Sequence, residues 1–328
     1  MSARKVRRAR AALFAPPWLS KAAANLDRFA SSKLARSVVT VAILAIAALL
    51  IRGELKSARL ADIAHAIAHV PPWAIGLAAA FTAATYFCGA VVEWQALKCI
   101  GRPLPLGRTI LAASGASALS IAMGFGLASG TAARLRFYAF AHLTAADVAK
   151  LTALVSGALY LSGLVTLGLA GLAAPTAFAG VLHWPAWGVV LLSAALLAPV
   201  PAWFLVLRRW RSHEFGPRGR AMALAAGLAN WIFQGAAMFV LAARHVTDFP
   251  AFLAAFGLGS LIGSLLGVPA DLGVLEATVL GSRALGAAHQ GAAALVLFRV
   301  IFQLVPLILA TSAVCGRQLV KLAGKATG

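Results

Sequence analysis

Four ionisable residues stand in or beside apolar segments in the last quarter of the chain. Asp271 and Glu276 flank a break in the apolar sequence, Arg283 follows, and Arg299 lies well inside the final apolar segment. A charge at the centre of a bilayer costs about 2.5–3.5 kcal/mol on insertion scales, so such groups are expected to pair or to face water. One interpretation is a buried ion pair between Glu276 and Arg299 that only holds helices together. The other is a polar path for a charged headgroup, with arginines facing phosphate and carboxylates facing an amine.

Three more polar positions extend this candidate substrate-binding set. Gln303 lies one turn after Arg299 and continues its polar face. Arg134 and Arg136 follow a glycine-rich stretch, where they would either collect anionic headgroups at the cytoplasmic face or act as ordinary positive-inside anchors. Both interpretations remain open at this stage.

Other kinds of chemistry find little support in the sequence. There is no Ser-His-Asp, Cys-His or paired-carboxylate pattern with convincing spacing, and no GxxxxGK[ST] loop for hydrolysing ATP. His65 and His69, with Asp62 nearby, offer too few ligands for a metal site. Glycines four residues apart, as at Gly259 and Gly263, are typical of close helix packing in membranes. We therefore expect no catalysis, no metal and no cofactor.

The composition explains why these polar residues are informative. Hydrophobic residues make up 61% of the 328 positions, charged residues only 12%, and the mean hydropathy is +0.88. The long apolar stretches lack a two-residue alternation, so they predict membrane helices and not a barrel. The 29 Lys and Arg residues, against 9 Asp and Glu, gather in the N-terminal tail, the loops and the C-terminus. That pattern indicates membrane orientation and lipid contact, and it argues against nucleic acid as a partner.

Apolar segments and charge parity predict the topology. The segments run over 38–51, 71–92, 109–130, 148–173, 184–207, 221–243, 252–268 and 291–315. If all of them crossed the membrane, the arginine-rich loop 208–220 would lie outside and the uncharged loop 174–183 inside, against the positive-inside rule. A return of Thr109–Gly130 to the cytoplasmic side removes both conflicts, because its glycine-rich end at 124–130 is a poor continuous helix. Thr144 and Asp147 form a capping-box-like start for the next helix.

A second broken hairpin is expected from Phe252 to about Leu285, interrupted at Pro269–Gly273 and opening outward. The prediction is therefore an all-α polytopic membrane protein with about six full spans and two re-entrant broken hairpins in an inverted repeat. The repeat units are 71–173 and 221–315, with a substrate site where the breaks meet. Residues 1–36 would form a basic cytoplasmic tail, 37–316 the transmembrane domain and 317–328 a short basic cytoplasmic C-terminus.

The chain resembles a known family at three groups of residues in this order. They are Gly124-Phe125-Gly126 through Arg134-x-Arg136-x-Tyr138, then Pro269-x-x-Leu-Gly-Val-x-Glu276, then Leu297-Phe298-Arg299 ending in Leu304-Val305-Pro306. They resemble the membrane domain of lysylphosphatidylglycerol synthases, the multiple peptide resistance factor group, and its stand-alone relatives, over residues 37–315. The resemblance implies lipid translocation, without a synthase part after the last span. Stand-alone relatives have been linked to hopanoid biosynthesis and to polyprenyl-linked glycosylation. Ala270-Asp271 departs from the glycines that the family commonly has there.

The leading hypothesis is a flippase that moves an amphiphilic phospholipid or isoprenoid lipid between leaflets of the cytoplasmic membrane, with both termini in the cytoplasm. Its partners would be lipids with anionic or zwitterionic headgroups. The alternative is a non-transporting partner or scaffold of a separate lipid-modifying enzyme. A membrane-embedded transferase ranks third, because no catalytic constellation supports it.

Overall fold

The computed structural model describes residues 70–124, 126–209, 216–242, 248–271, 273–281 and 288–312. Within these ranges the chain is helical and contains no strand. The basic tail, the expected span 38–51, the pair His65 and His69, and the C-terminus 317–328 lie outside the described residues.

Seven helical segments in the described ranges are long and apolar enough to cross a membrane. The chain is therefore an all-α, multi-pass membrane protein. The helices are α5 (Pro72–Cys99), α6 (Leu106–Met123), α7 (Gly126–Phe137), α8 (Ala145–Ala173), α9 (Pro175–Leu182), α10 (Ala186–Leu197), α11 (Pro199–Arg209), α12 (Pro217–Ala242), α13 (Phe249–Leu266), α14 (Val274–Gly281) and α15 (Ala288–Arg299). Shorter turns are η1 (Ala139–Ala141), η2 (Pro269–Asp271) and the π-helical η3 (Val300–Leu304).

Local signals set where several helices begin. The capping box expected before α8 is confirmed: Asp147 N donates to the Thr144 hydroxyl at 3.1 Å, and Thr144 N donates to the Asp147 carboxylate at 3.3 Å. The prediction that segment 174–183 forms a loop is wrong, because this segment contains α9. Pro175 stands in the first turn of α9, where its missing N–H needs no partner, and the Phe178 side chain is fully buried.

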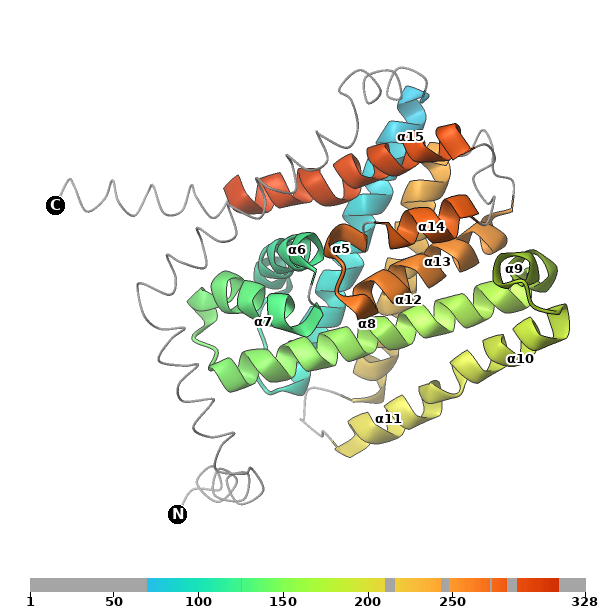
Figure 1. The fold of residues 1–328 in the computed structure, drawn as a ribbon. Helices are drawn as coiled ribbons and strands as arrows, with labels where there is room; N and C mark the ends of the chain where they lie inside the picture. The colour runs from blue at the N-terminus through green and yellow to red at the C-terminus, as the bar shows by residue number, and fades with distance from the viewer. Residues whose placement is uncertain are drawn as a thin grey trace, which may run out of the picture.

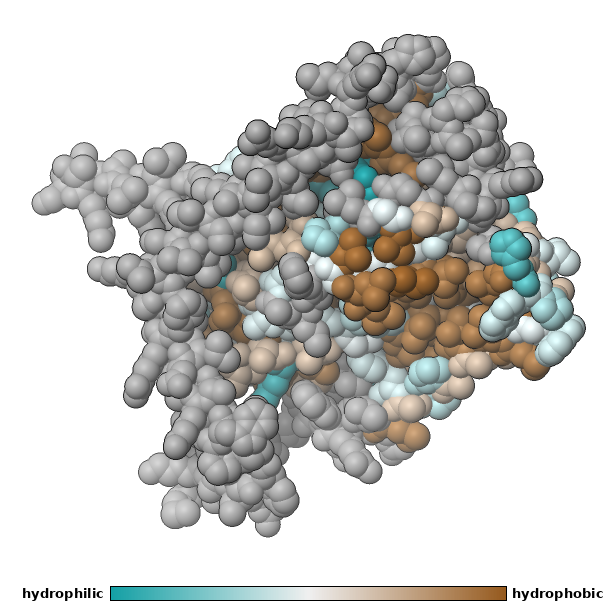
Figure 2. Space-filling model, in the orientation of Figure 1, coloured by the Kyte–Doolittle hydropathy of each residue, from teal (hydrophilic) through white to brown (hydrophobic). Residues whose placement is uncertain are grey.

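Helices α9, α10 and α11 form an outer layer on one side of a central bundle made by the other helices (Figure 1). α5 and α12 pack closely along each other, and the long α8 packs against α10, α12 and α13. Seven aromatic rings pack in sequence across this core, from Phe249 through Phe239, Phe252, Phe256, Phe298 and Phe302 to Tyr86. Such pairs each add about 0.5–1.5 kcal/mol beyond area burial. Figure 2 shows hydrophobic side chains over much of the described surface on one face, which suits contact with lipid.

Two helices break at glycines, and the two breaks touch. α6 and α13 are each 18 residues long and end at glycines with positive φ, Gly124 (φ 64°) and Gly267 (φ 69°). A Cβ on Gly124 would lie 2.5 Å from the Gly267 carbonyl oxygen and 2.7 Å from Pro269 N. The Ser129 hydroxyl donates to the Gly124 carbonyl across the first break. The first break was predicted from the sequence; the second begins at Gly267 and not at Pro269, because Gly267 adopts the left-handed cap.

The last span contains a π-helical turn after Arg299. Pro306 lacks the N–H that an α-helix would donate to the carbonyl of Phe302. The Tyr86 hydroxyl of α5 donates to that carbonyl at 3.2 Å. A side chain from another helix thus satisfies a backbone acceptor that the proline leaves open inside the membrane.

The contact between the breaks predicts that Gly124→Ala destabilises the protein. A Cβ there would meet backbone atoms that cannot move as a side-chain end does, and φ of 64° with ψ of −148° disfavours any other residue. We expect a loss of about 1–3 kcal/mol, measured by SDS titration in mixed micelles. The control is Gly76→Ala in α5, where no atom lies within 4 Å of the new Cβ. A Gly124→Ala protein as stable as the control would contradict the packing described.

Candidate functional site

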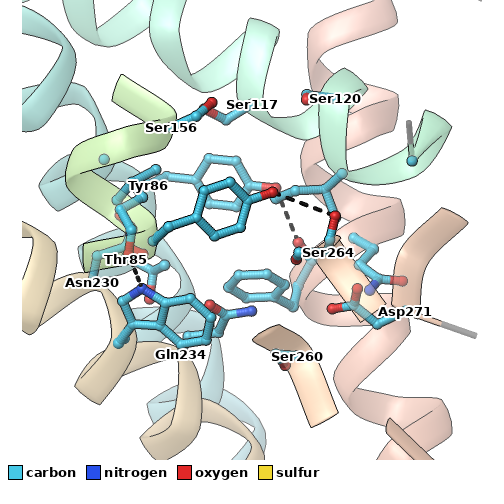
Figure 3. Close-up of a pocket in the computed structure, with 18 of the residues that line it drawn as sticks. Thr85, Tyr86, Ser117, Ser120, Ser156, Asn230, Gln234, Ser260, Ser264 and Asp271 are labelled. Atoms are coloured by element: carbon cyan, nitrogen blue, oxygen red, sulfur yellow. Dashed lines mark hydrogen bonds between the residues drawn. The ribbon is translucent and has the colours of Figure 1, made fainter. Parts of the chain in front are cut away.

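A cavity of about 200 Å³ lies where the two broken helices meet (Figure 3). Side chains from α5, α6, α7, α8, α12, α13, α14 and α15 line it, together with both breaks at Gly124 and Gly267. Helices α9, α10 and α11 contribute none of its lining. The cavity therefore belongs to the central bundle, and the outer layer stands apart from it.

Hydroxyl and amide groups dominate the polar lining of this cavity. Figure 3 shows Ser117, Ser120 and Ser156 on one side of Tyr86, and Gln234 and Ser260 on the other. The uncharged polar residues of the lining are Thr85, Tyr86, Ser117, Ser120, Ser156, Tyr160, Asn230, Gln234, Ser260, Ser264 and Gln303. Polar groups facing a shared space inside apolar helices need partners, so the site is suited to a polar ligand or to water.

Long-range hydrogen bonds fix the walls of the cavity. The Asn230 amide of α12 donates to the Thr85 carbonyl at 2.8 Å, which ties α12 to α5. The neighbouring Trp231 ring donates to the Leu159 carbonyl of α8 at 2.8 Å. The Tyr160 hydroxyl donates to the Ser264 carbonyl at 3.4 Å near the end of α13. Each bond satisfies a polar group inside the bundle and sets the position of a lining residue.

A buried ion pair joins α5 to α7 at the edge of the cavity. Arg134 donates from Nε and Nη2 to the two carboxylate oxygens of Glu93, each at 2.9 Å, and from Nη1 to the Gly130 carbonyl at 3.3 Å. Glu93 is 0% exposed and Arg134 5% exposed. Two parallel bonds between a guanidinium and a carboxylate are the strongest neutralising arrangement available. Burial of Tyr138 and the nearby Glu93 charge raise the pKa of the Tyr138 phenol, so the phenol stays neutral.

Three of the candidate residues line the cavity: Asp271, Gln303 and Arg134. Asp271 has a φ of 54°, and its carboxylate lies against Gly263, where a Cβ would come within 2.5 Å of Oδ1. Gly263 therefore makes room for the carboxylate. Arg134 lines the cavity, is buried and is bound to Glu93. It therefore belongs to the wall of the site and not to an exposed cytoplasmic surface that would meet headgroups.

The other candidate residues are not brought into the cavity by the described structure. Arg299 is buried but does not line the cavity, and Arg136 is half-buried and outside the lining. The backbone of Glu276 lies in α14, while its side chain is outside the described structure, as is the whole of Arg283. Their roles stay predictions.

Two residues at or beside the cavity, Glu93 and Ser260, are not singled out by the sequence pattern. The apolar segment expected from the sequence ends at Val92, but α5 continues to Cys99 and carries Glu93 inside it. A single acid with apolar residues on both sides was the available signal. The Ser260 hydroxyl lines the cavity, is 1% exposed and has no hydrogen-bond partner among the described residues. No sequence signal distinguishes this serine from the others in α13.

Comparison with known proteins gives a distant relative. No protein-family model matches the chain. The chain is 25% identical over 219 residues to the uncharacterized protein slr0712 of Synechocystis sp., and the similarity covers 63% of this chain and 68% of that protein. The name of that relative assigns no activity, so the geometry of the cavity carries the functional argument.

The buried ion pair predicts that removal of one partner is costly. Glu93→Ala leaves the Arg134 charge without its carboxylate, and we expect a loss of about 3–5 kcal/mol in SDS titration. The double variant Glu93→Ala/Arg134→Ala should cost less than the sum of the single variants, because no unpaired charge remains. Arg102 provides the control: it pairs with Asp147 at 3.1 Å but is 47% exposed, so Arg102→Ala should cost at most about 1 kcal/mol. Equal losses in both pairs would count against this account.

Proposed function

We propose that the protein is a lipid flippase, which moves the headgroup of an amphiphilic membrane lipid through the cavity while the tails stay in the bilayer. The observation that carries this proposal is a cavity with many hydroxyl and amide groups in its lining, among apolar membrane helices at the meeting point of two helix breaks. Its volume of about 200 Å³ is below the range of roughly 300–1,000 Å³ of pockets that hold whole drug-sized ligands. A headgroup fits that size, and lipid chains do not.

The arrangement of the helices supports an inverted repeat with two re-entrant hairpins. α5, the broken pair α6/α7 and α8 come first, and α12, the broken pair α13/α14 and α15 follow in the same order. The equivalent helices α5 and α12 pack against each other, and the equivalent glycines Gly124 and Gly267 meet. Contacts between equivalent elements are expected near a pseudo-two-fold axis, and transporters built from such repeats bind substrate there. Transport then requires the two touching breaks to separate.

The distribution of charge supports an orientation in the cytoplasmic membrane. Lys98, Arg102, Arg108, Lys150 and Arg218 lie near the ends of helices α5, α6, α8 and α12. The Arg102–Asp147 pair joins the end of α5 to the start of α8, so these ends share one side. Among the described residues of the opposite side, 70–73, 174–188 and 248–250 contain no Lys or Arg. The positive-inside rule then assigns the basic side to the cytoplasm. The Lys and Arg residues in both terminal segments favour the same location for the termini.

The family resemblance agrees with this proposal. Its first motif contains the break at Gly124, and its second begins with the turn from Pro269 to Asp271. These motifs therefore fall on the two elements that meet at the cavity. A resemblance to the membrane domain of lysylphosphatidylglycerol synthases implies translocation of lipid and no lipid synthesis by this part.

A second candidate function, a non-transporting partner of a lipid-modifying enzyme, is favoured by the outer layer. The span Ala186–Leu205 is only 11% buried, against 61% for the span of α8. Trp184, Trp187 and Leu191 are exposed there and line a shallow apolar surface. Lipid or another membrane protein would cover such a surface equally well, so this candidate ranks below transport.

Blocking the cavity should abolish translocation. Ser264→Trp places an indole among the lining residues, whereas Leu265→Trp changes the adjacent residue, which is 69% exposed and outside the lining. In proteoliposomes with labelled lipids, we expect the Leu265→Trp protein to translocate lipid as the natural protein does. The Ser264→Trp protein should fall to the rate of protein-free liposomes. Failure of the natural protein to move any lipid class would reject the flippase and favour the partner function.

Single cysteines test the orientation. In a background without the native cysteines, Arg102→Cys and Gly216→Cys should react with an impermeant maleimide only from the cytoplasmic side. Trp184→Cys, which lies at the other end of the bundle and is 53% exposed, should react only from outside. Labelling of position 216 only from outside would refute the re-entrant hairpins, because simple crossings by every apolar segment would place the loop 208–220 outside.

A further inference from the structure

The charges of the cavity disfavour an anionic headgroup. Among the described residues, Arg134 and Asp271 are its only charged lining residues. Three donors of Arg134 are already bound, two to the Glu93 carboxylate and one to the Gly130 carbonyl. Glu93 neutralises Arg134, so this cation is already paired within the protein. A phosphate is held most strongly by cations, and Arg134, the cation among the described lining residues, already binds a carboxylate.

The uncharged lining matches a ligand that both donates and accepts hydrogen bonds. Serine, threonine and tyrosine hydroxyls do both, and so do the amides of Asn230 and Gln234. A phosphate oxygen mainly accepts and an ammonium group only donates, so each would use half of this capacity. Hydroxyl groups on a ligand both donate and accept, so they can use the full hydrogen-bonding capacity of this lining. The Asp271 carboxylate adds a strong acceptor for such hydroxyls.

Ser260 provides an independent sign of a ligand. Its hydroxyl lines the cavity, is 1% exposed and has no hydrogen-bond partner among the described residues. A buried hydroxyl without a partner costs free energy. The hydroxyls of Thr82, Ser162 and Ser193 also lack a partner among the described residues, but they lie outside the cavity, whereas Ser260 lines it. The Ser193 hydroxyl of α10 is also buried and has no partner within the described ranges, but it lies outside the cavity and packs against Gly171. The two serines therefore form a matched pair for testing.

Aromatic rings and size narrow the ligand further. Tyr86, Trp231 and Phe298 contribute to the lining, and their flat apolar faces suit the C–H face of a small saturated ring. A volume of about 200 Å³ is below the roughly 300–1,000 Å³ of pockets that hold whole drug-sized ligands, so it suits a small headgroup. That is the scale of one monosaccharide or cyclic polyol.

We propose that this cavity binds an uncharged, polyhydroxylated headgroup, a sugar or polyol, of a membrane amphiphile. The proposal rests on the proposed flippase function for the transport of that amphiphile, but the binding chemistry stands on the cavity itself. It differs from the anionic or zwitterionic headgroup expected from the sequence, because Arg134 is committed to Glu93.

Binding is tested on the full chain in a zwitterionic detergent that contains no sugar. The probes are octyl glycosides of glucose, galactose and mannose, with octyl phosphate and octylamine at equal concentrations below micelle formation. We expect saturable binding of at least one glycoside by calorimetry, with a rise in thermal stability, and no saturable binding of the two charged probes. Ser260→Ala should weaken glycoside binding about three- to tenfold, the effect of one hydrogen bond. Ser193→Ala should leave it unchanged.

The charged probes define what would overturn the proposal. Tighter binding of octyl phosphate or octylamine than of every glycoside, or saturable binding of no glycoside, rejects it. Asp271→Asn adds a second criterion: a polyol should still bind with only a few-fold loss, because an amide also accepts hydrogen bonds. Saturable octylamine binding that this variant abolishes while the protein stays folded would instead indicate a cation site.

Proteoliposomes separate this inference from the flippase itself. A labelled glycolipid that moves faster than a labelled phospholipid supports both. If a phospholipid moves and the glycolipid does not, the flippase stands and the headgroup inference fails. If no lipid moves although a glycoside binds and Ser260→Ala weakens that binding, the headgroup chemistry stands and transport fails.

Discussion

The contact between the two helix breaks is the constraint on which the rest of the structure depends. A broken helix exposes backbone N–H and C=O groups, which lipid cannot satisfy, so breaks at membrane depth must be buried in protein or line a polar cavity. Gly124 lies directly against the Gly267 carbonyl and Pro269, and this closeness leaves no room for a side chain at position 124. The polar cavity lies beside that contact. The surrounding helices hold the two breaks in place.

Electrostatic balance follows from the same need to keep polar groups paired. Glu93 and Arg134 neutralise each other at the edge of the cavity through two bonds of 2.9 Å, which removes the cation most able to attract phosphate. Tyr86 satisfies the Phe302 carbonyl that Pro306 leaves open. What remains facing the cavity is a set of hydroxyls, amides and the Asp271 carboxylate. A structural ion pair thus has an electrostatic consequence, because Arg134 in the cavity wall is paired within the protein.

Several parts of the fold could be predicted from the sequence because their causes are local. The Thr144–Asp147 capping box and the break after Met123 depend on residues within one or two turns. The sequence-based boundary of α5 at Val92 was wrong because hydropathy fell at Glu93, whose charge is compensated by a distant residue. Segment 174–183 contains a helix in which Phe178 is buried by neighbouring helices. This burial depends on tertiary packing, so no local sequence pattern predicts it.

By itself, the sequence determined the class of the protein, its apolar helices and the approximate positions of both breaks, since hydropathy and backbone preference act over short distances. It also drew attention to Asp271 and Gln303, which line the cavity. Only the tertiary structure decided that Arg134 binds Glu93, 41 positions away, and that Arg299 is buried outside the lining. Such pairings depend on how helices far apart in the chain pack together. A buried charge takes whichever partner that packing brings within reach.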